Sequence, residues 1–120
     1  MVRITPDVGK NRVVIEFIGH VSAADLTQAA EVTEAALERL QTPVDVLSDI
    51  RDLQTLDEEI LAAFRKVGGV LGHFGVRRVV RVVGKSAKAA VQLERLSRSL
   101  KDHAAHLAFS MEEAERVFAK

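Results

Sequence analysis

Hydrophobic residues follow two different spacings along this chain of 120 residues. Short runs of β-branched residues alternate with longer segments in which apolar side chains recur every three or four positions. The first spacing is typical of strands and the second of amphipathic helices. The pattern predicts five strands, at Val2–Thr5, Arg12–Ile18, Val44–Ser48, Arg77–Val83 and Ala105–Phe109.

Four amphipathic helices are predicted, one after each strand from the second onward. Three begin with a possible capping box, in which a hydroxyl and an acidic side chain three residues later satisfy each other's backbone N–H groups. These pairs are Ser22 with Asp25, Thr55 with Glu58, and Ser110 with Glu113. Ser86 is expected to cap the remaining helix. The most regular apolar stripe is Ile60, Phe64, Val67, Leu71 and Phe74. Gly75 is placed to end that helix.

The order of elements, β-β-α-β-α-β-α-β-α, is that of an α/β domain. The turn chemistry of residues 6–11, with Pro, Gly and Asn, predicts an antiparallel hairpin at the start. Strands separated by helices should run parallel, with right-handed crossovers. The apolar run in Arg77–Val83 places that strand inside the sheet. We expect a single domain over residues 1–120 with a mixed sheet of about five strands.

Composition excludes several classes of function. Seventeen basic and seventeen acidic side chains cancel, so no strong field attracts nucleic acid or anionic lipid. The chain has no Cys, which removes disulfides, thiolate nucleophiles and Cys-ligated zinc. No metal and no cofactor are expected. No apolar segment approaches the roughly 20 residues that cross a bilayer, and Met1 opens no signal peptide, so a cytoplasmic location is expected.

The densest polar cluster follows the third strand, in what is predicted to be a loop that opens a helix. Parallel sheets usually bind ligands at this carboxyl edge. Helix capping with solvation, partner binding and acid–base catalysis all remain open for the cluster. The candidate partner or ligand residues are Asp49, Arg51, Asp52, Thr55, Asp57 and Glu58.

Three weaker features could contact a ligand, an anion or another subunit. His20 ends a strand, where a ligand pocket could lie. Lys85 and Ser86 start a helix, where backbone amides could hold an anion, although the position five residues before Gly84 is Val79 and no phosphate-binding loop is formed. The spacing of Gly69, Gly72 and Gly75 gives a smooth strip late in the helix, which fits close packing, a frayed helix end or a subunit contact.

Three local segments carry a family resemblance. They are Phe17-Ile18-Gly19 at the end of the hairpin, the segment Val44–Leu53 with its Asp49-Ile50-Arg51-Asp52-Leu53 ending, and Arg78–Gly84. In these and in element order, the chain resembles STAS domains, the fold of the bacterial anti-sigma factor antagonists, and more closely their SpoIIAA-like branch. The resemblance implies an Asp-Ser pair after the third strand, whose phosphorylation blocks partner binding. The matching stretch is Leu56-Asp57-Glu58-Glu59, so Glu58 replaces the serine and Thr55 is a nearby hydroxyl.

We therefore expect a non-enzymatic regulatory domain that contacts another protein, either a regulator or a second copy of itself. The alternative is a small-molecule or lipid-binding domain, or an enzyme, with a strand-end pocket of His20, Asp49, Arg51 and Lys85. A deep apolar cavity would favour the alternative. A filled core with a flat polar face would favour the protein-interaction domain.

Overall fold

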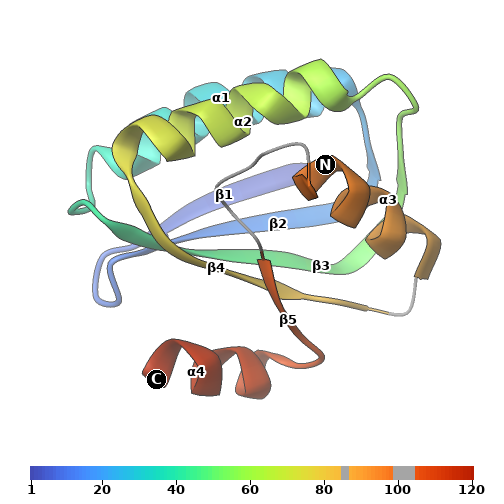
Figure 1. Cartoon of the computed structure of the whole chain (residues 1–120). Helices are drawn as coiled ribbons and strands as arrows, with labels where there is room; N and C mark the ends of the chain where they lie inside the picture. Colours follow the sequence, from blue (N-terminus) through green and yellow to red (C-terminus); the bar gives the residue numbers. More distant parts are fainter. Residues whose placement is uncertain (85–86, 99–104) are drawn as a thin grey trace.

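A computed structural model describes residues 1–84, 87–98 and 105–120 (Figure 1). The strands form one sheet in the order β1-β2-β3-β4-β5, with β1 antiparallel to β2 and the others parallel. The elements in chain order are β1 Val2–Asp7, β2 Arg12–Val21, α1 Ala23–Leu37, β3 Val44–Leu56, α2 Leu61–Phe74, β4 Val76–Val82, α3 Ala87–Arg98, β5 Ala105–Ala108 and α4 Met111–Ala119. The predicted order, the hairpin and the interior position of β4 are confirmed.

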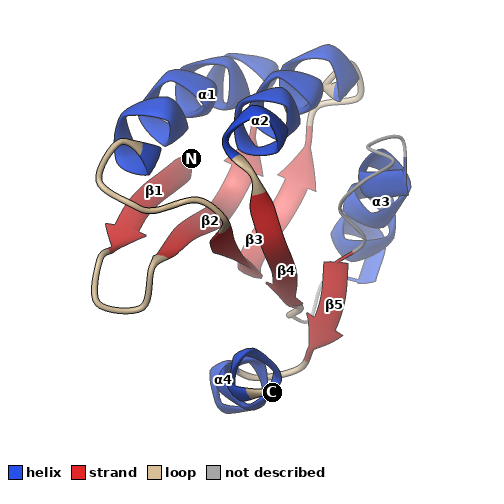
Figure 2. Ribbon diagram, turned by 60° about the vertical axis from the view of Figure 1, so that its left-hand side comes forward, coloured by secondary structure: helices blue, strands red, loops and turns tan. Residues whose placement is uncertain are grey.

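Helices cover the two faces of the sheet unequally, as Figure 2 shows. The strands are added in chain order, so each right-handed crossover moves in the same direction and leaves its helix on the same face. Helices α1, α2 and α3 therefore share one face. The last helix, α4, follows β5 without leading to a further strand, and it lies against the opposite face (Figures 1 and 2).

Capping explains where two of the helices begin. Ser22 and Asp25 form a complete capping box at the start of α1, as predicted. Ser110 caps α4 by accepting a hydrogen bond from the N–H of Glu113, whose carboxylate accepts from Phe109 instead of closing the box. Gly75 ends α2 with φ 108°, in the region that favours glycine. The predicted cap Ser86 lies outside the described residues.

The end of β3 contradicts one prediction. The strand was expected to end at Ser48, with a loop from Asp49 to Glu59, but it continues to Leu56. Between Glu16 and His20, its pairing with β2 shifts twice, each time with one extra residue on β3. Such bulges bend the strand and interrupt the two-residue alternation. Buried side chains consequently recur every third residue, at Ile50, Leu53 and Leu56.

Because the strand continues, Thr55 does not cap α2. The N-cap of α2 is Ile60, which has no side-chain cap, and the first turn of the helix contains no acidic residue. The predicted capping box of Thr55 and Glu58 is therefore wrong. The Thr-x-x-Glu spacing falls across the end of a strand and the turn after it.

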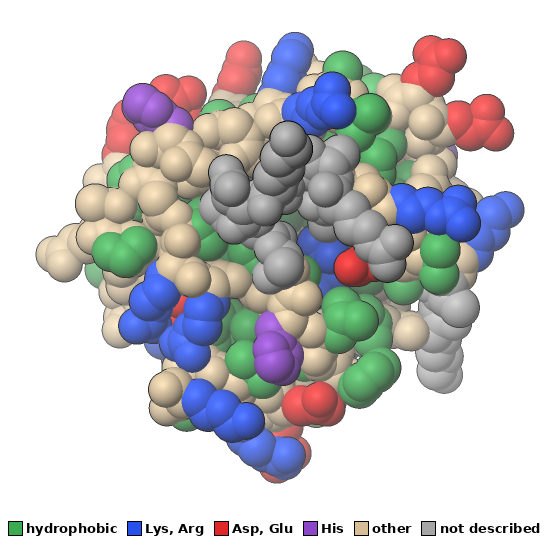
Figure 3. All heavy atoms as spheres, in the orientation of Figure 1, with side chains coloured by type: hydrophobic (Ala, Val, Ile, Leu, Met, Phe, Trp, Pro, Cys, Tyr) green, Lys and Arg blue, Asp and Glu red, His purple; other side chains and the backbone are tan. Residues whose placement is uncertain are grey.

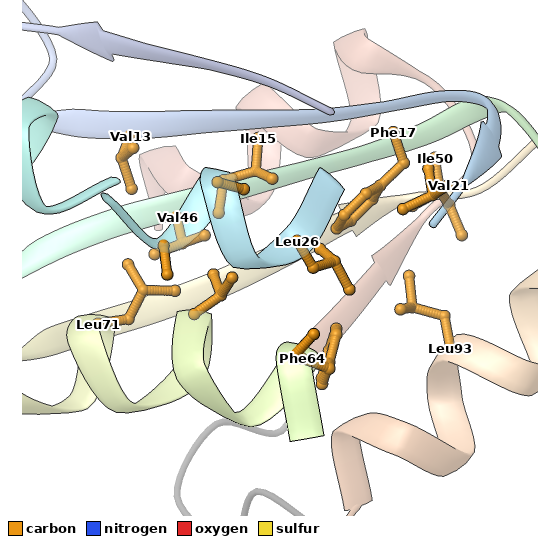
Figure 4. Close-up of a cluster of buried hydrophobic side chains, with 14 of the residues drawn as sticks. Val13, Ile15, Phe17, Val21, Leu26, Val46, Ile50, Phe64, Leu71 and Leu93 are labelled. Atoms are coloured by element: carbon orange, nitrogen blue, oxygen red, sulfur yellow. The ribbon is translucent and has the colours of Figure 1, made fainter. Parts of the chain in front are cut away.

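The core consists of a larger cluster under α1, α2 and α3 and a smaller one under α4. In the larger cluster, Figure 4 shows strand residues such as Ile15 and Val46 pointing toward Phe64 and Leu71 of α2. The smaller cluster contains Leu47, Val80, Val82, Ala108, Ala114 and Phe118. Aliphatic side chains, with Phe17, Phe64 and Phe118 among them, thus fill both interfaces, as expected from the low aromatic content of 4%.

Polar contacts also attach α4 to the sheet. The guanidinium of the buried Arg12 lies 3.8 Å from the centroid of the Phe118 ring and pairs with Glu115 at 2.5 Å. Arg78 donates to the carbonyls of Val117 at 2.9 Å and Phe118 at 2.7 Å. Cations at the end of a helix suit its dipole, so Arg78 contributes to the position of α4.

Candidate functional site

Three polar side chains meet where β2 and β3 end. His20 Nδ1 lies 2.6 Å from Thr55 Oγ1, and its Nε2 lies 2.7 Å from Asp57 Oδ1. His20 and Thr55 are partners in the register of the two strands, which brings their side chains together. If the imidazole carries its proton on Nε2, it donates to Asp57, and Nδ1 accepts from the Thr55 hydroxyl. The arrangement resembles that of a nucleophile, a base and an orienting carboxylate.

Asp57 also fixes this cluster to α1. Its Oδ2 accepts a hydrogen bond from the N–H of Ala23, the first residue of that helix, at 3.1 Å. This backbone hydrogen bond, followed by the hydrogen bond from His20, lowers the pKa of the Asp57 carboxyl below its ordinary value. Asp57 is therefore ionised at neutral pH, and it joins the ends of β2 and β3 to the start of α1.

A groove of about 700 Å³ adjoins Thr55. Gln54, Thr55 and Glu58 lie on the side of β3, and Lys88, Gln92 and Arg95 lie on the side of α3. The two cationic residues are exposed. The groove therefore offers both charge signs and a hydroxyl to a bound molecule. The predicted ligand residue Glu58 belongs to this groove.

The other predicted residues lie farther back along β3. Asp49 is buried and faces Glu16 in the register, whereas His20 faces Thr55, six residues farther along β3 and so roughly 15–20 Å away. Burial alone would raise the pKa of Asp49, but hydrogen bonds from Arg51 and its charge outweigh burial and lower it. Arg51 donates to Asp49 at 3.0 and 2.8 Å. The predicted pocket of His20, Asp49, Arg51 and Lys85 is not assembled by the described residues.

Of the remaining candidates, Asp52 is exposed on β3 and pairs with Ile18 in the register. Lys85 and Ser86, predicted to hold an anion, lie outside the described residues. Within the described ranges, no cluster of three or more His, Asp or Glu side chains could hold a metal ion. In the same ranges, no helix has both the length and the apolar character needed to cross a membrane.

Sequence reasoning missed two features of this region. Lys88 was considered only as an anion contact beside Lys85, and its place with Arg95 opposite Thr55 was not identified, because only the packing of α3 brings these residues near Thr55. The second is Arg81, whose side chain is 6% exposed and lies 3.5 Å from both Ser48 Oγ and Glu94 Oε2. Burial lowers the pKa of Arg81. A charged residue inside the apolar run of β4 was the available signal.

A cavity between α2 and the sheet is small. It has a volume of about 60 Å³, and its walls include Phe17, Phe64, Gly68 and Arg81. This volume cannot enclose an acyl chain. The space under α2 is therefore a nearly filled core.

Comparison with known proteins shows similarity in structure but not in sequence. No protein-family model matches the sequence, and no curated protein matches it. An uncharacterised protein of the DUF3478 family from Shewanella loihica PV-4, described as having a SpoIIAA-like fold, has a TM-score of 0.70 and 18% identity. The alignment covers 98% of this chain and 92% of that one.

Two structures of the anti-sigma factor antagonist SpoIIAA are also similar. The unphosphorylated form has a TM-score of 0.59 and 13% identity, and the alignment covers 98% of this chain and 97% of that one. The phosphorylated form of the Bacillus cell fate determinant SpoIIAA has a TM-score of 0.54 and 15% identity, with coverage of 98% and 99%. With its five-stranded mixed sheet and four helices in the same order, the chain has the STAS, or SpoIIAA-like, fold.

Proposed function

We propose that this chain is a non-enzymatic, cytoplasmic protein-interaction domain that binds its partner at the end of β3. The contact surface consists of His20, Thr55, Asp57, Glu58, Lys88 and Arg95, and we call it the β3-end surface. The observation that supports it most is the prolonged β3, which presents an internally hydrogen-bonded polar cluster beside an open groove. Hydrogen bonds between the cluster's own side chains hold it in place before a partner arrives, which lowers the entropic cost of binding.

The nearly filled core favours this function over ligand storage. A lipid-binding or small-molecule-binding domain usually surrounds its ligand with a cavity of several hundred Å³. Here the cavity under α2 is about 60 Å³, whereas the larger hollow lies open between β3 and α3. Arg51 and Asp52 extend the proposed surface along β3, and Asp49 holds the Arg51 guanidinium in position.

We further propose that Glu58 replaces the serine that SpoIIAA-like antagonists phosphorylate. A carboxylate cannot form a stable phosphate ester, so a kinase would have no acceptor at this position. The negative charge is then permanent. A partner should therefore recognise the acidic Asp57 and Glu58 with basic groups, and Lys88 and Arg95 with acidic ones.

The test is a comparison of charge reversals. Glu58→Lys and Arg95→Glu alter the two sides of the groove, and Glu112→Lys on α4 is the matched control because its side chain is 81% exposed on the opposite face of the molecule. Each tagged variant is used to isolate partners from native lysate, and binding is then measured with the purified partner. We expect a loss of at least tenfold in affinity for the two groove variants and none for the control. Equal binding by all three would contradict the proposal.

The enzyme alternative keeps one specific observation in its favour, the contact of Thr55 with His20. If the hydroxyl is activated, its oxygen should attack the phosphorus of a fluorophosphonate as the proton passes to His20 Nδ1 and fluoride leaves. Intact-mass measurement would then show an adduct on Thr55 that is absent from His20→Gln. An unmodified wild-type protein supports the non-enzymatic function, and an adduct that depends on His20 supports the enzyme.

A further inference from the structure

A second groove, of about 610 Å³, lies on the outside of the helix layer between α1 and α2. Ala30 and Leu37 of α1 and Val70 and Phe74 of α2 supply its apolar lining. It involves the C-terminal halves of both helices and shares no residue with the β3-end surface. We call it the α1–α2 groove.

The two sides of the α1–α2 groove carry opposite charges. Glu31, Glu34 and Glu38 form an acidic wall on α1, and the basic wall on α2 consists of Lys66, which supplies its positive charge, and His73. All five side chains are exposed. Figure 3 shows side chains of both charge signs along the upper edge of the molecule, where α1 and α2 lie.

The part of the chain that the structure describes offers these side chains no partner. Among the described residues, no ion pair or side-chain hydrogen bond involves Glu31, Glu34, Glu38, Lys66 or His73. Exposed charges elsewhere do pair, as Arg116 does with Glu112 at 2.9 Å and Lys10 with Glu115 at 3.4 Å. The groove separates its two walls, so they do not neutralise each other.

Gly69 is a second, independent feature of this groove. It lies inside α2, where glycine costs roughly 1 kcal/mol relative to alanine. A Cβ added at Gly69 would meet nothing within 4 Å, so packing inside the chain does not require the glycine. A close approach by another molecule would explain why this position has no side chain.

We propose that the occupant of the α1–α2 groove is a second copy of this chain, related by a two-fold axis parallel to the helices. Helices α1 and α2 both connect parallel strands in the same direction, so they run side by side in the same sense. Rotation about an axis along the groove places α1 of one protomer over α2 of its partner. The dimer then contains two equivalent pairs of facing walls, one acidic and one basic in each pair, and the apolar linings meet between them.

The first experiment measures the mass of the full chain in solution by sedimentation velocity, at low salt and over a range of concentrations. We expect a species of twice the 13.1 kDa chain mass, which dissociates as salt is raised because screening weakens exposed charge pairs. Glu31→Lys/Glu34→Lys should be monomeric, and so should Lys66→Glu/His73→Glu. The control Glu112→Lys should remain dimeric.

The decisive experiment mixes the two monomeric variants in equal amounts. In a heterodimer, the α1 wall of the first variant, now basic, faces the α2 wall of the second variant, now acidic. The other pair of facing walls keeps its native charges. The mixture should therefore form dimers again, which a folding defect in either variant would not permit. Gly69→Gln should also be monomeric while keeping its thermal stability, because its side chain has room in the free chain.

A wild-type protein that stays monomeric at every concentration would overturn the proposal. A dimer unaffected by both wall variants, or variants that fail to recover dimers on mixing, would overturn it as well. None of these results bears on partner binding at the β3-end surface.

Discussion

Replacing glycine by alanine should change the free energy of unfolding in opposite directions at Gly84 and Gly69. A Cβ added at Gly84 would lie 2.6 Å from Arg51 Cα and in contact with the Arg51 carbonyl oxygen. These are backbone atoms, so no side-chain rotation relieves the overlap, and β3 or the end of β4 must move. Gly69, in contrast, has open space where its Cβ would be.

The expected magnitudes follow from this difference. Overpacking costs about 1–3 kcal/mol, so Gly84→Ala should lower the free energy of unfolding by that amount. Gly69→Ala removes a helix-interior glycine without a clash and should raise it by about 0.5–1 kcal/mol. With a urea dependence of about 1.5 kcal/mol per molar, the midpoint should fall by roughly 0.7–2 M in the first case and rise by roughly 0.3–0.7 M in the second.

Urea denaturation followed by circular dichroism measures both midpoints, at protein concentrations low enough that association does not contribute. Wild type and the two variants should share one slope, because the surface exposed on unfolding is the same. A Gly84→Ala midpoint equal to that of wild type would show that the close approach to Arg51 does not constrain this position. A lower midpoint for Gly69→Ala would refute the assignment of open space there.

Three further substitutions test other parts of the structure. Phe64→Ala should cost about 3–5 kcal/mol in urea denaturation, since Phe64 is buried between α2 and the sheet, and a smaller loss would mean that the site collapses around the cavity. Ser22→Ala should cost about 0.5–2 kcal/mol by removing the α1 capping box, with Ser22→Asp retaining most of the stability. Burial would raise the pKa of Asp45, but the hydrogen bonds and charge of Arg77 outweigh it and lower the pKa. Ionised Asp45 therefore stabilises the fold above its unfolded-state pKa, and this contribution is lost as pH falls through the lower folded-state pKa, so wild type should lose more stability than Asp45→Asn between pH 5 and pH 2.

The fold was predictable because each interior element carries its own local signal. β-Branched runs mark β2 and β4, the stripe from Ile60 to Phe74 marks α2, and Ser22 and Gly75 mark helix ends by chemistry that acts within a few residues. Parallel pairing then follows from the alternation of strands and helices. No comparison with another protein is needed for these inferences.

The error at β3 has a physical cause. Two extra residues change the spacing of Ile50, Leu53 and Leu56 from two to three, and a strand with that spacing does not show the expected alternation. The polar residues between them consequently resembled a loop. A Thr-x-x-Glu match then placed Thr55 at a helix start, although Ile60 holds that position.

His20, Thr55, Asp57 and Glu58 of the candidate site were named singly from the sequence but not as a unit. His20 and Asp57 are 37 residues apart, and their contact depends on the register of β2 against β3. Nothing in the local sequence at a bulge shows which residue of the neighbouring strand it will face. The cationic side of the groove depends in the same way on where α3 packs.

Among the described elements, α4 alone covers the second face of the sheet, so the described chain divides into regions of unequal opening free energy. Detaching α4 breaks the smaller apolar cluster and the contacts of Lys10, Arg12 and Arg78 with α4, and leaves the cluster under α1, α2 and α3 intact. Such a segment opens by itself more readily than the whole domain unfolds, so amide hydrogens in α4 should exchange before those of β2 and β3. The opened state uncovers Leu47, Val80 and Val82 together, an apolar strip on a sheet, so we expect loss of α4 to promote aggregation.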